Sequence, residues 1–179
     1  HMNIPRYLEL YKEGRLEEAF ESVAIDNPLP ASTGRVCQHP CEDRCRRTAI
    51  DEAVNMRDVH RHIADAVFES GRAGALIDRV VARRLAPTGK RAAIVGAGPA
   101  GLACGYYLAM LGHGVMIYDR NAEAGGMLRY AHPEYRLPNP VLDREIGLIR
   151  RMGVEFTFNT EVGKDIQVSD LAQQYDAVF

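Results

Sequence analysis

The sequence predicts an α-helical domain over residues 3–86, followed by the first part of an α/β domain over residues 90–179. Two observations predict this order. Apolar residues recur at helical spacing before Pro87, whereas strand-like and helix-like segments alternate after it, as in a parallel sheet covered by helices. The Pro-Thr-Gly-Lys sequence at residues 87–90 interrupts the helical pattern and marks the boundary between the domains.

The first domain begins with two amphipathic stripes, at residues 5–13 and 16–26, which predict a helical hairpin because Gly14 separates them. A third helix is predicted over residues 54–69 and a fourth over residues 75–85. Residues 27–50 lie between these helices and show no periodicity. We therefore expect something other than hydrophobic packing to order them, and their three cysteines are the candidates.

In the second domain, residues 91–95 and 115–118 predict parallel strands on either side of a helix over residues 99–111. Asn139 is predicted to cap a further helix, with Pro140 in its first turn. Apolar and polar residues then alternate over residues 154–159, which predicts a half-buried strand. Residues 177–179 are typical of the opening of another buried strand, so we expect the chain to be part of a longer protein.

The composition excludes several classes of protein. Hydrophobic residues make up 46% of the chain and charged residues 26%, as in ordinary globular proteins. The net charge of -2 gives no electrostatic reason to expect nucleic acid or an anionic membrane as a partner. The sequence contains no apolar run of membrane-spanning length and no secretory signal, which predicts a cytoplasmic protein without membrane insertion.

Residues 92–101 place a Gly-x-Gly-x-x-Gly motif between a predicted strand and a predicted helix, the context in which this motif binds a dinucleotide. Gly96 permits the tight turn, Gly98 lets backbone approach a pyrophosphate, and Gly101 lets the helix pack on the strand. The pyrophosphate would lie at the positive end of the helix. Asp119 ends the second strand and is placed to accept hydrogen bonds from a ribose. The alternative is a plain tight turn, and the motif does not distinguish FAD from NAD(P).

Three of the four cysteines, Cys37, Cys41 and Cys45, lie within nine residues, which indicates metal chemistry rather than disulfides. An iron-sulfur cluster and a structural zinc ion both suit this spacing. The fourth cysteine, Cys104, lies in a predicted helix of the second domain and is interpreted as a core residue. The fourth ligand is therefore sought among the groups that remain, His39, His60, His62 and Thr33. Nearby arginines form either a basic collar for a negative cluster or a solvated loop.

Further motifs, together with these, carry a family resemblance, and they lie at residues 27–31, 34–37, 39–42, 51–54, 96–102 and 130–138. They resemble the NAD(P)H-dependent glutamate synthase small subunit family. That family includes similar reductase modules attached to hydrogenases, formate dehydrogenases and dihydropyrimidine dehydrogenase. The resemblance covers nearly the whole chain.

The resemblance implies an iron-sulfur-bearing helical domain and a Rossmann-like domain that binds FAD, with an NAD(P)H domain inserted further along the chain. Hydride would pass from NAD(P)H to FAD, and single electrons would leave through [4Fe-4S] clusters to a large catalytic subunit or another electron-acceptor protein. No residue is assigned as a catalytic acid or base. The candidate cofactor-binding residues are Gly96, Ala97, Gly98, Pro99, Ala100, Gly101, Asp119, Arg120, Gly126, Met127, Leu128 and Val162, and the candidate metal ligands are Cys37, Cys41, Cys45 and His60.

The chain departs from the family pattern at several points. Thr33 stands where the family typically has a cysteine. Some relatives complete a cluster with a non-cysteine group from the following helix, which favours His60. Residues 131–133 depart from the usual Gly-Ile-Pro near the flavin. The NAD(P)H domain is absent from the sequence, so we expect the fragment to be inactive alone. The alternative function is a binding or scaffold module whose cysteine loop holds zinc or no metal.

Overall fold

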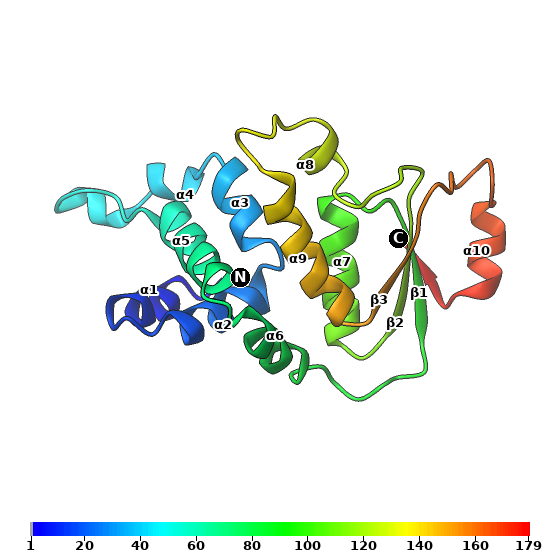
Figure 1. The fold of residues 1–179 in the computed structure, drawn as a ribbon, viewed down its shortest axis with the longest axis horizontal. Coiled ribbons are helices and arrows are strands. Elements are labelled where there is room, and N and C mark those ends of the chain that lie inside the picture. The colour runs from blue at the N-terminus through cyan, green and yellow to red at the C-terminus, as the bar shows by residue number, and fades with distance from the viewer. Residues whose placement is uncertain (1) are drawn as a thin grey trace. The chain divides into compact units, whose positions relative to one another are not determined.

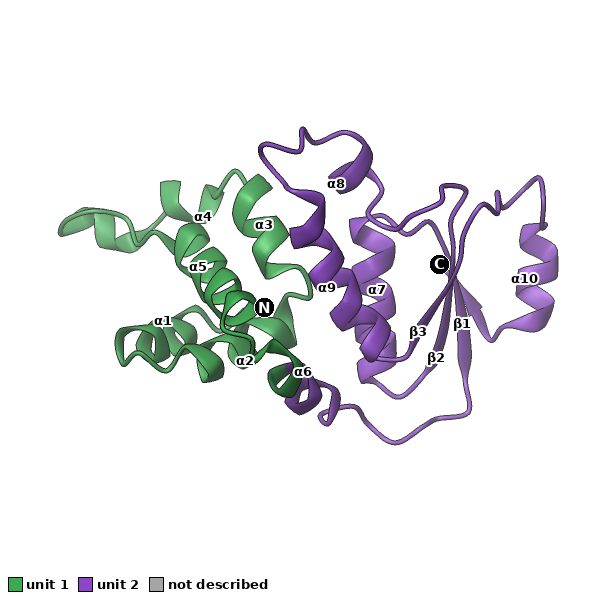
Figure 2. Cartoon of the chain, viewed as in Figure 1, with its two compact units in different colours: residues 1–76 green, residues 77–179 purple. Residues whose placement is uncertain are grey.

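The structure, a computed structural model, describes residues 2–179 and divides into two compact units, His1–Leu76 and Ile77–Phe179 (Figures 1 and 2). Helices and turns make up the described part of the first unit, and a parallel sheet organises the second. The predicted fold class is therefore confirmed. The division falls earlier in the chain than the boundary predicted at residues 87–90, because residues 77–86 group with the sheet.

The first unit is a set of short helices packed around α5. Its elements are α1 (Ile4–Lys12), α2 (Leu16–Asp26), α3 (Pro30–Val36), α4 (Pro40–Asp43), the 3-10 helix η1 (Arg46–Ala49) and α5 (Met56–Glu69), and α6 (Ala73–Val81) crosses into the second unit. The predicted hairpin is present, since α1 and α2 pack on each other and on α5. Tyr7, Phe20 and Ile63 are among the fully buried side chains of this core.

Helix α3 corrects the prediction that something other than packing, with the cysteines as candidates, orders residues 27–50. It packs closely against α5, and a Cβ atom added to Gly34 would lie 2.4 Å from Cβ of Arg61. Arg35 also forms a two-fold hydrogen-bonded ion pair with Asp65 of α5, with both distances at 2.9 Å. The prediction was wrong for this segment because small residues allow the close approach, and small residues do not produce an apolar stripe in the sequence.

The second unit contains a parallel sheet of four strands in the order β3-β2-β1-β4. Its elements are β1 (Arg91–Val95), α7 (Pro99–Met110), β2 (Gly114–Tyr118), α8 (Met127–Tyr130), α9 (Asn139–Arg151), β3 (Val154–Thr157), α10 (Val168–Gln174) and β4 (Ala177–Val178). Helices α7 and α9 cover one face of the sheet, and α10 lies on the other side (Figure 1).

Two details of this unit differ from the sequence prediction. Pro138, not Asn139, is the N-cap of α9, so Asn139 and Pro140 are its first two residues. Strand β3 ends at Thr157, because Asn159 adopts a positive φ of 52° that does not continue a strand.

The segment that enters β1 is bound to the end of α7. The guanidinium of Arg84 donates to the carbonyl oxygen of Ala109 at 3.2 Å, and the backbone N–H of Leu85 donates to Met110 at 2.9 Å. Gly153, just past the end of α9, also faces Arg84, since a Cβ atom there would lie 2.9 Å from Nη1. Arg84 therefore places a positive charge near the negative ends of two helices.

Replacing Arg84 by alanine is expected to lower the free energy of unfolding by about 1–2 kcal/mol, because a charge-assisted hydrogen bond and a favourable helix-end charge are both lost. Urea denaturation followed by circular dichroism measures the change. Arg144 is exposed on α9 and provides the control, since its replacement is expected to change stability by less than about 0.5 kcal/mol. Equal effects of the two substitutions would contradict the role given to Arg84.

Candidate functional site

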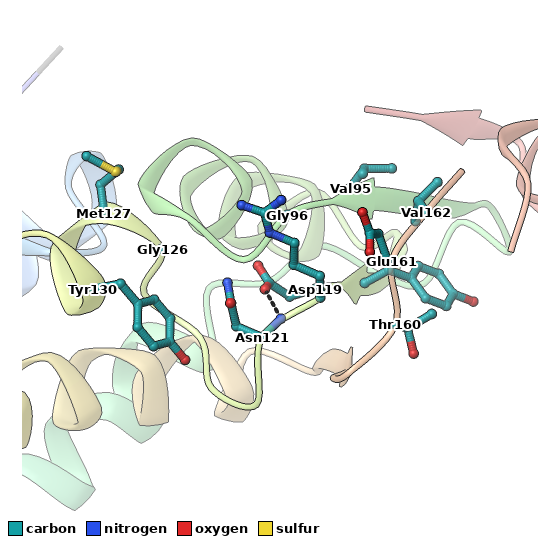
Figure 3. A pocket seen from close by; sticks show the side chains of 12 residues that line it. Val95, Gly96, Asp119, Asn121, Gly126, Met127, Tyr130, Thr160, Glu161 and Val162 are labelled. Carbon is teal, nitrogen blue, oxygen red and sulfur yellow. Dashed lines mark hydrogen bonds between the residues drawn. The ribbon is translucent and has the colours of Figure 1, made fainter. Parts of the chain in front are cut away.

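The main cavity of the second unit opens where the order of the strands reverses. The chain passes from β1 to β2 on one side and returns with β4 on the other, and ligands of open parallel sheets bind beside the carboxyl ends of strands at such a point. The cavity has a volume of about 470 Å³ (Figure 3). Six predicted residues line it: Gly96, Asp119, Arg120, Gly126, Met127 and Val162.

The cavity is also lined by six residues that were not predicted to bind a cofactor: Val95, Tyr118, Asn121, Tyr130, Thr160 and Glu161. Val95 and Tyr118 end strands β1 and β2, and Asn121, Thr160 and Glu161 lie within four residues of the end of a strand, which is the signal that could have identified these five. Ala97 and Leu128, in contrast, were predicted to bind the cofactor, and both side chains are buried in the protein. Only their backbone groups are therefore suited to that role.

The glycine turn between β1 and α7 has the geometry that its motif requires. Gly96 has a φ of 101°, which favours glycine, and its N–H donates to the carbonyl of Tyr118 at 2.7 Å. A Cβ atom on Gly101 would lie 1.9 Å from the carbonyl oxygen of Gly96. The first turn of α7 thus packs directly on the end of β1, which is the contact predicted for the third glycine.

Two glycines just before α8, Gly125 and Gly126, lie against this turn. The N–H of Gly125 donates to the carbonyl of Ala97 at 2.8 Å, and a Cβ atom on Gly126 would lie 2.7 Å from Cα of Gly98. A Cβ atom on Gly98 itself would lie 3.9 Å from Gly126, which is an ordinary contact. Packing within the protein therefore does not require glycine at position 98. Its missing side chain leaves open the backbone at the positive end of α7, which suits a close-lying pyrophosphate.

Asp119 has a structural role that the sequence did not predict. Its Oδ2 atom accepts the N–H of Ala97 at 2.6 Å, and Oδ1 accepts the N–H of Asn121 at 2.8 Å (Figure 3). The side chain is 7% exposed. The carboxylate thus holds the glycine turn to the end of β2. Each carboxylate oxygen can accept a second hydrogen bond, so the predicted role toward a ribose remains chemically open.

Aromatic and apolar side chains line other parts of the cavity wall. Tyr118 shares a hydrogen bond of 2.9 Å with the hydroxyl of Tyr175, and burial raises its pKa, so its phenol stays neutral. Met127 and Tyr130 of α8 are 68% and 53% exposed although both are large and apolar. Exposed apolar side chains at a cavity are typical of a surface that a ligand covers.

The three clustered cysteines lie on successive short elements of the first unit. Cys37 follows α3, Cys41 lies in α4 and Cys45 precedes η1, and all three thiols are free. Within residues 2–179, no three His, Cys, Asp or Glu side chains are gathered closely enough to hold a metal ion. The structure thus places the predicted ligands on one segment but does not bring them together. Hydrogen bonds from the backbone N–H groups of Val54 and Arg47 lower the pKa of Cys45, which favours its thiolate.

The predicted fourth ligand, His60, has an unused ring nitrogen. Its side chain is 5% exposed, and Nδ1 lies 2.9 Å from the carbonyl oxygen of Met56. A carbonyl only accepts, so Nδ1 carries the proton and Nε2 of the neutral ring carries a lone pair. Burial lowers the pKa of His60, which favours this neutral state. Nε2 is buried and has no hydrogen-bond partner among the described residues. Metal-bound histidines typically have this arrangement.

The other candidates for the fourth ligand fit less well. The hydroxyl of Thr33 donates to the carbonyl of Leu29 at 2.7 Å and accepts from Asn27 at 2.9 Å, so its proton and one of its two lone pairs are already used. His62 is exposed and packs edge-on against Tyr11. Nδ1 of His39 is also buried without a hydrogen-bond partner among the described residues, but it faces a carboxylate oxygen of Glu42 at 3.4 Å.

Comparisons with known proteins match both units. Residues 1–72 match a family model described as dihydropyrimidine dehydrogenase domain II, 4Fe-4S cluster, and residues 94–153 match one described as an NAD(P)-binding Rossmann-like domain. Among the described residues, no helix combines the length and the apolar character needed to cross a membrane.

Homologues cover the whole chain. It is 41% identical over all of its length to the NADPH-Fe(3+) oxidoreductase subunit beta of Geobacter sulfurreducens, of which it covers 26%. It is 41% identical over 98% of its length to the glutamate synthase (NADPH) small chain of Bacillus subtilis, of which it covers 34%. It is 38% identical to the NADP(+)-dependent formate dehydrogenase subunit beta of Moorella thermoacetica, of which it covers 27%. The chain thus spans about a quarter to a third of these relatives, and the resemblance read from its motifs is confirmed.

Proposed function

We propose that this chain, a homologue of glutamate synthase small chains and of NADPH-dependent oxidoreductase beta subunits, holds the FAD and a [4Fe-4S] cluster of an NAD(P)H-oxidising electron-transfer protein. When bound, FAD takes hydride from NAD(P)H, and the iron-sulfur centre passes electrons on singly. The observation that carries the proposal is the open glycine turn at the beginning of α7, where the protein's own packing leaves room for a pyrophosphate.

The second unit supplies the dinucleotide site. Backbone N–H groups at the beginning of α7 bind the pyrophosphate, and Asp119 contacts a ribose while it holds the turn in place. We assign FAD rather than NAD(P) because the loop before α8 rests on the glycine turn and presents Met127 and Tyr130 to the cavity. A flavin has a large apolar ring system that these two side chains suit.

The first unit supplies the cluster ligands. The thiolates of Cys37, Cys41 and Cys45 and Nε2 of His60 would hold the cluster, which would supply one-electron transfer there. The buried lone pair of His60 supports this ligand set, and so do three free thiols in one mostly exposed segment. The guanidinium of Arg57, which interacts electrostatically with Cys37, offsets part of the negative charge of such a centre.

We further propose that electrons leave to a large catalytic subunit or another electron-acceptor protein. The relatives are named as subunits or as a small chain, which supports an assembly with a larger partner. Cofactor analysis of anaerobically purified protein tests the proposal. Denaturation is expected to release FAD, and iron and acid-labile sulfide are expected in equal amounts. Release of only NAD(P) would contradict the assignment of FAD, and zinc without sulfide would favour a scaffold module instead.

A further inference from the structure

We propose that Glu42 is a positioning residue for the cysteine centre. Its carboxylate fastens α4, which carries Cys41, to the beginning of α5, which carries His60. The inference rests on the proposed iron-sulfur function and deepens it, because it names the contact that keeps one thiol beside the helix that supplies the fourth ligand.

Helix α4 needs such a contact. It has four residues and buries none of its side chains, and it begins after His39, which adopts a left-handed φ of 45°. A helix of this length is not stable by itself, since nucleation of a single turn is unfavourable. Hydrophobic burial therefore does not hold Cys41 in place, and a polar contact has to do so.

Glu42 makes that contact with a backbone N–H in the first turn of α5, which has no partner within the helix itself. Its Oε1 atom accepts the backbone N–H of Arg57 at 3.0 Å, and its side chain is only 15% exposed. The next N–H along the helix, that of Asp58, donates to the side chain of the N-cap residue Asn55. Glu42 thus acts as a second cap of α5, supplied by another helix. A carboxylate at this end of a helix is also favoured by the positive end of the helix dipole.

Hydrogen bonds at the carbonyl of Met56 relate the contact between Glu42 and Arg57 to the proposed ligands. The hydroxyl of Tyr7 donates to the carbonyl of Met56 at 3.5 Å, and Nδ1 of His60 donates to the same oxygen. Burial, together with electrostatic interaction with Cys41 and Glu42, raises the pKa of Tyr7 to about 12, so both groups lie near this phenol. Glu42 thus contacts the first turn of α5, the turn whose Met56 carbonyl also accepts from His60 and Tyr7.

Two substitutions distinguish the effect of the hydrogen bond of Glu42 from the effect of its negative charge. In Glu42→Gln, the amide oxygen still accepts the N–H of Arg57, so the position of α4 is kept while one negative charge near the cluster is removed. The midpoint potential of the cluster is then expected to become more positive. In Glu42→Ala, the hydrogen bond is lost as well, and α4 with Cys41 is no longer fastened to α5.

The experiment measures iron, acid-labile sulfide, electron paramagnetic resonance spectra and midpoint potentials in anaerobically purified protein. Glu42→Ala is expected to contain at least twofold less iron and sulfide than the wild type, with an unchanged helical circular dichroism spectrum. Glu42→Gln is expected to keep the full content and to show the more positive potential. Asp43→Ala is the matched control, because Asp43 is the exposed neighbouring carboxylate on the same helix, and it is expected to keep the full content.

A wild-type cluster content and spectrum in Glu42→Ala would overturn the inference, and so would an unchanged potential in Glu42→Gln. If Glu42→Ala loses helical structure, Glu42→Gln still decides, since loss of the cluster from that variant would also overturn it. Absence of iron and sulfide from the wild type would instead overturn the proposed function, so the two failures are distinguishable.

Discussion

Replacing Gly98 by alanine is expected to weaken FAD binding at least a hundredfold, about 3 kcal/mol, while leaving the free energy of unfolding nearly unchanged. Gly98 has a φ of -77° and a ψ of 179°, which alanine adopts without strain. The added Cβ would meet only an ordinary contact at 3.9 Å within the protein. It would, however, occupy the space above the backbone where a pyrophosphate has to approach. Binding is measured by the quenching of flavin fluorescence, and stability by urea denaturation.

The neighbouring glycines provide controls for this experiment. Gly101→Ala is expected to destabilise the second unit by several kcal/mol, because its Cβ would lie 1.9 Å from a backbone oxygen. Gly147→Ala on α9 has no neighbour within 4 Å and is expected to bind FAD normally, with a slight gain in stability. Wild-type affinity in Gly98→Ala would show that no pyrophosphate lies against this turn.

Replacing His60 by alanine is expected to remove most of the cluster, because the fourth iron loses its proposed protein ligand. His60→Cys is expected to restore iron and sulfide content, since a thiolate is the ordinary ligand of such clusters. The readout specific to ligation is the hyperfine coupling of ¹⁵N-labelled histidine in the electron paramagnetic resonance spectrum. That coupling is expected in the wild type and not in His60→Cys.

His62 supplies the control, because it lies on the same helix with an exposed side chain. His62→Ala is expected to retain both the cluster and the nitrogen coupling. Full iron and sulfide in His60→Ala with an unchanged spectrum would contradict ligation by His60. Loss of the coupling in His62→Ala would assign the ligand to that residue instead.

The long periodic segments of the chain could be predicted well from the sequence. Helices α1, α2, α5, α7 and α9 all carry an apolar stripe or a clear capping signal, and the glycine motif lies between β1 and α7 as expected. Helices α3 and α10 could not be predicted in this way. Each has seven residues; α3 packs through small residues, and α10 begins with a hydrogen bond from the N–H of Gln167 to the carboxylate of Asp170.

Those parts of the candidate site whose role depends on local backbone geometry could be predicted from a motif. The hydrogen-bond partners of side chains could not, because they come from other segments of the chain. The motif identified Gly96 and Gly101 because their roles depend on local backbone geometry. It could not reveal that Asp119 accepts the N–H of Ala97, since that contact joins separate segments of the chain. Likewise, the sequence favoured His60 over Thr33 only through the family resemblance, and the unpartnered Nε2 of His60 and the hydrogen bonds of the Thr33 hydroxyl become visible only in the fold.

The double hydrogen bond of Asp119 has a further consequence for binding. Because the buried carboxylate already fixes the turn before any ligand arrives, the site is preorganised. A dinucleotide that docks there meets a turn whose backbone is already hydrogen-bonded, so less backbone entropy is lost on association than if the turn had to become ordered.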